Sequence, residues 1–305
     1  MRLKKSDLLP LILCSVIWGA YYVASQKLVG YTSVFTSGLG IRFVTMIILG
    51  MIMLMLGEIP LLMKTGGILG KLILIGTFGF LLDLTAFIGL SMSSAASGSA
   101  LLKCDIIMVN IMSMIIYRQR FGWKLWAWTL LMLFGVLLVM GIDFSTFRIG
   151  DPGNLFFLLS AFFVSCNAFV IKSTQHDKKN PACDDVIAFY NNFVTMVFFT
   201  VTSLVMGTIG QVTSFWTSGS VLAALLCAAV GQTTVYVVYY HNLRRYPVWL
   251  VKTFLLLMPV VSSLISMALF GETLVAEQYM GILVILIGAM GVLMDQRSVK
   301  SRKEN

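Results

Sequence analysis

Four charged residues inside long apolar stretches carry the clearest chemical signal in the sequence: Arg42, Asp83, Lys103 and Asp105. An ionisable side chain at the centre of a bilayer costs roughly 2.5–3.5 kcal/mol on insertion scales, so it should be paired and face a bundle interior or water. We therefore expect these four residues to form a site for a substrate or a coupling ion. The alternative is an ion-pair network that only fixes helix register.

The spacing of these residues places them at a common depth. Asp83 lies ten residues before, and Lys103 ten residues after, a tight turn expected near Ser93. At about 1.5 Å per helical residue, both would lie ~15 Å below one surface, near the centre of a ~30 Å hydrocarbon core. Arg42 reaches a similar depth, ~14 Å, from the same side.

Pairing within this layer depends on which way each side chain points. Lys103 and Asp105 are two residues apart, so on a continuous helix they project about 200° from each other. We favour a pair of Asp83 with Lys103, which leaves Asp105 near Arg42. A buried carboxylate of this kind could load and release protons during transport.

Polar and aromatic residues elsewhere would complete a cavity. Gln232, Tyr236, Asn110 and Trp18 are the further candidates, because aromatic faces beside amides suit an organic amine or amino acid. Tyrosine and tryptophan also collect at membrane interfaces in any multispan protein. We therefore expect Tyr239 and Tyr240 to lie at the membrane interface. Trp18 and Tyr236 could lie either at the interface or in the cavity. Lys252 is expected to extend its side chain so that the ammonium reaches the membrane surface.

Composition excludes a soluble protein. Of 305 residues, 58% are apolar and only 11% are charged, and the mean hydropathy is +0.91. Soluble chains carry about 25% charged residues.

The net charge of +9 comes from lysines and arginines between apolar runs, so it predicts no nucleic-acid partner. Four of the five cysteines lie in apolar runs, which argues against a disulfide framework.

Hydropathy predicts an all-α membrane protein with ten transmembrane helices, since a span needs roughly 20 apolar residues. The first segment follows a basic start, and we interpret it as a retained helix rather than a signal peptide. The expected spans are 8–29, 33–56, 71–92, 94–117, 123–140, 153–171, 186–206, 220–240, 247–270 and 276–294.

Loop charges predict the orientation, because cytoplasmic loops are rich in lysine and arginine. Of 22 such residues, seventeen fall on one side if the N-terminus is inside, and only Lys27 and Arg148 fall outside. The protein is therefore expected in the cytoplasmic membrane, with both termini in the cytoplasm. Residues 1–142 and 152–295 then form two inverted five-helix repeats, an architecture of transporters, and residues 296–305 form a basic cytoplasmic tail.

Weak self-similarity supports the duplication. The string Phe43-Val-Thr-Met46 recurs as Phe193-Val-Thr-Met196, an offset of 150 residues, and Gly135 matches Gly288 at an offset of 153. Similar offsets in the same order through both halves are typical of an internal repeat.

With these features the chain resembles the EamA-type permeases of the drug/metabolite transporter superfamily, over both halves. The resemblance rests on Trp18-Gly19, Arg42-Phe43, Gly231, Tyr236, Pro259 and the string Gly271-Glu272-Thr273-Leu274 followed by Glu277-Gln278 and Gly281. It implies a bacterial ten-helix carrier that moves small metabolites by alternating access, often outward, with amino acids as common cargo. Lys103 and Asp105 occupy a helix that is usually uncharged in the family, and Ile106 and Gln119 stand where the repeat predicts proline and glutamate.

Other functions fit less well. The chain has no HExxH zinc motif, and its two histidines, His176 and His241, fall in expected loops, so we predict no metal, no cofactor and no enzyme. A dyad of Ser97 with Lys103 is the remaining enzymatic alternative. Among transporters, an exporter of lipophilic cations is the alternative to a carrier of amino acids or related amines. The predicted partners are a small solute, a coupling proton and the lipid bilayer; the sequence leaves the oligomeric state open.

Overall fold

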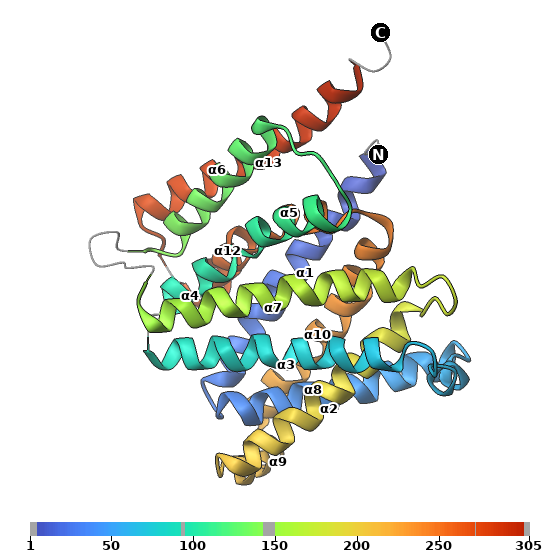
Figure 1. Ribbon diagram of the computed structural model, residues 1–305. Helices are drawn as coiled ribbons and strands as arrows, with labels where there is room; N and C mark the ends of the chain where they lie inside the picture. Colours follow the sequence, from blue (N-terminus) through green and yellow to red (C-terminus); the bar gives the residue numbers. More distant parts are fainter. Residues whose placement is uncertain (1–4, 93–94, 143–149, 272, 302–305) are drawn as a thin grey trace. The chain divides into compact units, whose positions relative to one another are not determined.

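The regular secondary structure is all helical in the part of the chain that the computed structural model describes, residues 5–92, 95–142, 150–271 and 273–301 (Figure 1). Eight helices in these ranges are long and apolar enough to cross a membrane, and a ninth apolar helix, α6 (Trp123–Val139), is shorter. All five cysteines are free thiols.

The helices group into two compact units, and each unit draws residues from both halves of the sequence. Unit 1 comprises Met1–Val16, Thr85–Ser165 and Tyr246–Asn305, and unit 2 comprises Ile17–Leu84 and Cys166–Arg245. Residues of α1 (Lys5–Val29), α3 (Leu69–Met92) and α7 (Pro152–Gln175) belong to both units. The remaining helices of unit 1 are α4 (Ala95–Leu102), α5 (Asp105–Ile116), α6, α11 (Val248–Leu255), α12 (Met258–Phe270) and α13 (Ala276–Ser301). Those of unit 2 are α2 (Val34–Met55), η1 (Ile59–Met63), α8 (Asp184–Val205), η2 (Ile209–Thr213), α9 (Ser214–Thr217) and α10 (Gly219–Arg245).

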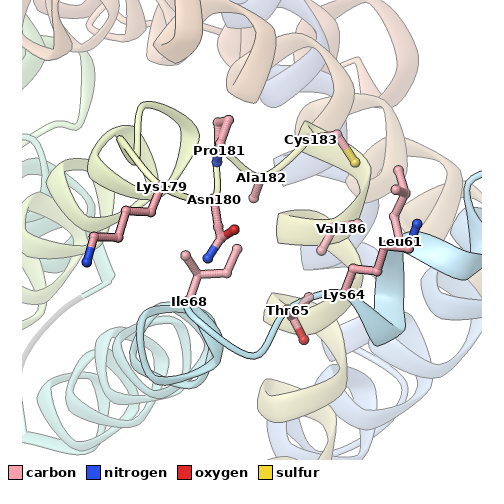
Figure 2. A pocket seen from close by; sticks show the side chains of 10 residues that line it. All are labelled: Leu61, Lys64, Thr65, Ile68, Lys179, Asn180, Pro181, Ala182, Cys183 and Val186. Carbon is pink, nitrogen blue, oxygen red and sulfur yellow. The ribbon is translucent and has the colours of Figure 1, made fainter.

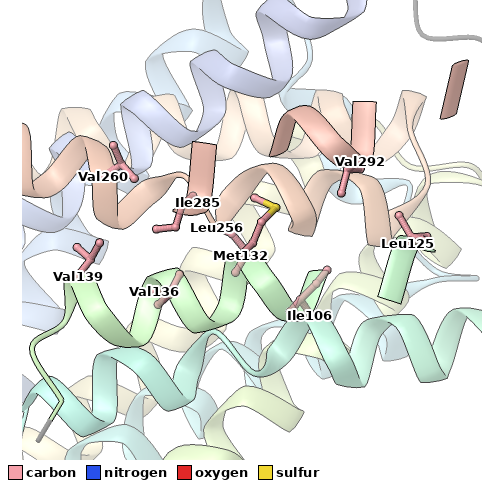
Figure 3. Close-up of a cluster of buried hydrophobic side chains, with 9 residues drawn as sticks. All are labelled: Ile106, Leu125, Met132, Val136, Val139, Leu256, Val260, Ile285 and Val292. Carbon is pink, nitrogen blue, oxygen red and sulfur yellow. The ribbon is translucent and has the colours of Figure 1, made fainter. Parts of the chain in front are cut away.

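Unit 1 is built around the packing of α6 on α13 (Figure 1). Small residues allow this approach: a Cβ added to Gly281 would lie 2.7 Å from the carbonyl oxygen of Gly135. Because lipid tails are as apolar as leucine, such close packing contributes more to association than burial from water does. The adjoining core combines α5, α6, α12 and α13 (Figure 3), and its members are Ile106, Leu125, Met132, Val136, Val139, Leu256, Val260, Ile285 and Val292.

Unit 2 is built around the packing of α2 on α8, with α10 against α2. The ring of Phe199 fills the space beside Gly38, where an added Cβ would meet it at 2.7 Å. A small core joins α1, α2, α9 and α10, and its members are Leu28, Ile41, Phe215, Val221, Leu225 and Ala228. Helix α2, which carries Arg42, is thereby held against α8 and α10.

Matching local details recur in the two halves of the chain. Gly57 and Gly207, 150 residues apart, both follow a long helix in the left-handed conformation, with φ of 70° and 68°. A short 3-10 helix, η1 or η2, begins two residues after each. A positive φ costs glycine little, so both positions suit this residue. The shared detail supports the predicted internal repeat.

Two of the expected spans are interrupted in the structure. Span 94–117 is divided into α4 and α5, with Lys103 and Cys104 between them. Span 247–270 is divided into α11 and α12, with Leu256 and Leu257 between them. Both breaks follow eight-residue helices and lie 153 residues apart, the offset that relates Gly135 to Gly288. In a membrane, non-helical backbone is tolerated where it is enclosed by protein or lines a cavity.

Candidate functional site: two buried charged centres

Unit 2 contains the first centre, which forms around the guanidinium of Arg42 on α2. Arg42 Nη2 lies 3.6 Å from Asp83 Oδ2 on α3. Arg42 Nη1 donates to the hydroxyl of Tyr236 on α10 and, at 3.5 Å, to Asn192 Oδ1 on α8. The planar guanidinium can serve acceptors on three helices at once because its donors are fixed in a fork. We call this group the Arg42 centre.

Aromatic side chains extend the Arg42 centre along α10. The Tyr236 ring lies 5.9 Å from Arg42 Cζ and 5.3 Å from the ring of Tyr240. Trp18 of α1 packs edge-on against Tyr239 at 4.9 Å. The predicted residues Trp18, Tyr236, Arg42 and Asp83 therefore share one unit, and buried Gln232 lies one turn before Tyr236 on α10.

Burial corrects the expectation for two of these tyrosines. Tyr239 is 5% exposed and Tyr240 is 1% exposed, so neither belongs to an interfacial belt. Tyr240 accepts a hydrogen bond of 2.7 Å from Asn191 Nδ2 on α8. A buried hydroxyl with a partner is the usual arrangement for tyrosine inside a protein. The tyrosines of α10 therefore link the helix to α8 as well as bordering the centre.

The second centre lies in unit 1, at the breaks between α4 and α5 and between α11 and α12. Lys252 Nζ, in the last turn of α11, lies 2.8 Å from Asp105 Oδ2, in the first turn of α5. Their side chains are 2% and 11% exposed. Lys103 Nζ lies 3.6 Å from the thioether sulfur of Met258, the first residue of α12. We call Lys103, Asp105 and Lys252 the break centre.

These pairs differ from the predicted ones. Asp83 pairs with Arg42, not Lys103, and Asp105 pairs with Lys252, not Arg42. The snorkelling interpretation of Lys252 is also wrong, since the residue is 3% exposed. Counting residues along a helix gives depth but not direction, and the 200° separation of Lys103 and Asp105 assumed a helix that the structure interrupts. No local signal identified Lys252 as the partner.

Asn110, one of the predicted site residues, lies on α5 and is 1% exposed. Its Oδ1 has no hydrogen-bond partner within the described residues, and the same holds for the hydroxyl of Ser113, one turn further on. Buried acceptors without partners are uncommon and demand an explanation such as water or a ligand. Sequence reasoning did not single out Ser113.

A separate cavity of about 270 Å³ lies in unit 2 between η1 and the segment that precedes α8 (Figure 2). Thr65, Ile68, Ala182 and Val186 contribute buried lining, and the exposed residues Lys64, Lys179 and Asn180 border it. None of the predicted site residues lines this cavity. Within the residues that the structure describes, no three His, Cys, Asp or Glu side chains group as metal ligands.

Both halves of the chain match one family model. The model of the EamA-like transporter family matches residues 6–141 and again residues 151–294. The chain belongs to the EamA-like transporter family. It is therefore a multi-pass membrane transporter and not an enzyme, as the sequence predicts. Glu272, in the string that resembles the family signature, falls outside the described residues, as do residues 143–149 between the two matches.

Relatives of this EamA protein include two bacterial proteins named probable amino-acid metabolite efflux pump. The one from Salmonella typhimurium is 25% identical over 281 residues, 91% of each chain. The one from Escherichia coli is 24% identical over 290 residues, 94% of each chain. A protein of known crystal structure has the same fold, with a TM-score of 0.77 and 15% identity, and the match covers 97% of this chain and 100% of the other.

Proposed function

We propose that this EamA transporter exports small zwitterionic metabolites, amino acids or related amines, across the bacterial cytoplasmic membrane by alternating access. The names of the Salmonella and Escherichia relatives support this cargo and direction. The matches cover more than nine-tenths of each chain, so the comparison concerns whole transporters rather than a shared fragment.

The Arg42 centre is the observation that carries this proposal. Its guanidinium and carboxylate are 3.6 Å apart, longer than the about 2.7–2.9 Å of a tight charge-assisted hydrogen bond. A solute with a carboxylate and an ammonium could engage both groups, one with Arg42 and the other with Asp83. Asp83 keeps 26% of its side chain exposed, so it is accessible for such an exchange.

The rings beside the centre support an amine on the solute. Cations are attracted to the faces of tyrosine and tryptophan rings by about 0.5–2 kcal/mol, depending on desolvation. Tyr236 already lies within 5.9 Å of the Arg42 guanidinium carbon, so its face takes part in cation binding in this structure. Trp18 and Gln232, from α1 and α10, belong to the same proposed site.

The proposed architecture is ten spans in two inverted five-helix repeats, residues 1–142 and 152–295, with both termini and the tail 296–305 in the cytoplasm. The eight long spans, α6, and α4 with α5 as one interrupted span support the count. An odd number of spans in each repeat gives the two repeats opposite orientations. Transporters commonly build their substrate sites from such repeats and from interrupted helices.

Reconstituted vesicles test the function. Purified protein should transport members of a mixed panel of amino acids and amines, and Arg42→Gln should lose this transport while Arg42→Lys keeps a fraction of it. Arg120→Gln, which changes an exposed arginine, is the matched control. An imposed pH gradient that drives transport would support proton coupling through a buried carboxylate such as Asp83.

The alternative is an exporter of lipophilic cations, for which Asp83 and the aromatic rings are the favourable features. A quaternary amine without a carboxylate belongs in the same panel for this reason. Transport of that amine, with no transport of any amino acid, would replace the zwitterion proposal by this alternative. No transport of either class would reject both.

A further inference from the structure

The break centre has an excess of positive charge. Among its described residues two are lysines and one is an aspartate, and the aspartate is already paired with Lys252 at 2.8 Å. Lys103 lies within electrostatic range of both. The partner of its ammonium is a thioether sulfur, a weak acceptor, 3.6 Å away. Within the described part of the chain, Lys103 therefore has no strong acceptor of the kind that a charged group inside a membrane protein normally has.

The ends of the half-helices strengthen this excess. The N-terminus of a helix carries a partial positive charge, which favours anions by about 0.3–1 kcal/mol and up to ~2 kcal/mol when partly buried. Asp105 provides a negative charge for the first turn of α5, whereas the first turn of α12 has no acidic residue. Lys103 contacts Met258 in that first turn. The Lys103 ammonium thus contacts the side chain of the residue with which α12 begins.

Accessibility separates Lys103 from the other two residues. Lys252 and Asp105 are buried at 3% and 8% exposure, whereas Lys103 is only half-buried. The pair can therefore hold the two breaks in position, whereas Lys103 has no carboxylate within salt-bridge distance among the described residues. Asp105 is fixed further, because its carbonyl oxygen accepts a hydrogen bond of 3.2 Å from the hydroxyl of Ser165 on α7.

We infer that the break centre is an anion-binding site, in which Lys103 and the first turn of α12 take the carboxylate group of a small organic solute. This site is additional to the Arg42 centre and belongs to the other unit. Asp105 and Lys252 act as positioning residues that keep α5 and α11 together. A carboxylate suits the site because a lysine ammonium and helix amides are its usual partners in proteins.

Binding to the purified full-length protein in detergent tests the inference without any transport assay. Thermal unfolding is followed during titration with acetate, with its neutral analogue acetamide, and with chloride. Acetate should raise the melting temperature in a saturable way and acetamide should not. Stabilisation by chloride as strong as that by acetate would overturn the carboxylate assignment and indicate a general anion site instead.

Variants locate the site. Lys103→Met should raise the melting temperature of the ligand-free protein, because it removes a charge without a strong partner, and should weaken acetate binding by about tenfold or more, the effect expected from losing ~1.4 kcal/mol. Lys103→Arg should keep the acetate response. Lys124→Gln, an exposed lysine on α6, is the matched control.

Two results would overturn the proposal. One is an acetate response that is absent from the wild type or unchanged in Lys103→Met. The other is a Lys103→Met protein that fails to fold, because this would make the lysine part of the structural framework. Vesicle transport by the Arg42 variants is a separate measurement, so the proposed function and this site can fail independently.

Discussion

Lys252 and Asp105 are separated by 147 residues along the chain, yet their charged groups meet at 2.8 Å inside unit 1. The lysine lies in the last turn of α11 and the aspartate in the first turn of α5, so each charge also complements the partial charge of its own helix end. This pair connects the two interrupted helices at the place where both lose regular hydrogen bonding.

Asp105→Asn should destabilise the protein strongly, because it removes the carboxylate that is paired with buried Lys252. Breaking a buried pair typically costs about 3–5 kcal/mol. The double variant Asp105→Asn with Lys252→Met should recover part of the loss. Unfolding of the single and double variants measures this coupling, and strictly additive shifts in melting temperature would contradict the pair.

Tyr236→Phe should weaken the Arg42 centre. It removes an acceptor from the Arg42 guanidinium, and hydrogen bonds to charged groups contribute about 1.5–3 kcal/mol. We expect lower stability together with slower vesicle transport of the proposed zwitterions. Tyr279→Phe, which changes a tyrosine that is 52% exposed on α13, is the control. Equal transport by both variants would remove Tyr236 from the site.

Gly281→Ala should disturb the packing of α6 on α13. The added Cβ would lie 2.7 Å from the carbonyl oxygen of Gly135, which is backbone and cannot move away easily. Overpacking of this kind typically costs about 1–3 kcal/mol. Gly50→Ala on α2 is the matched helical control, since a Cβ there has no neighbour within 4 Å. Equal melting temperatures for the two variants would show that α13 adjusts freely.

The pKa of Asp177, in the segment between α7 and α8, is lowered from 3.8 to about 2, chiefly by the hydrogen bond from Lys71 and further by the backbone N–H groups of Asn180 and Lys179. The folded pKa is below the unfolded one. The resulting stabilisation is therefore complete above about pH 4, the ordinary range for aspartate, and is lost as the pH falls through about 2.

Lys71→Met should lower the melting temperature at neutral pH, and the difference from the wild type should shrink between pH 4 and about 2 as Asp177 takes up a proton. Melting curves over this pH range provide the measurement. Lys64→Met, which changes an exposed lysine in the neighbouring segment, should give a difference that does not change with pH. A constant difference for Lys71→Met would exclude the ion pair as the cause.

Apolar runs and charge placement in the sequence determined the class of protein. A run of about 20 apolar residues can satisfy its backbone in lipid only as a helix, so composition and length suffice to find spans. They also identified Arg42, Asp83, Lys103 and Asp105 as charges within apolar segments, and counting residues along each segment predicted a common depth for them. The string beginning at Gly271 and the repeats at offsets of 150 and 153 residues led to the family.

Tertiary structure alone decided the partners. Which charge meets which depends on the rotation and crossing of each helix, and these follow from packing between distant segments such as α5 and α11. The break at Lys103 and Cys104 contains neither proline nor glycine, the residues that usually mark a helix kink. Nothing in the sequence of this segment therefore indicated a break. Lys252 was predicted to snorkel because it lies near a helix end. Its pairing with Asp105 could not be predicted, because burial is a property of the folded chain.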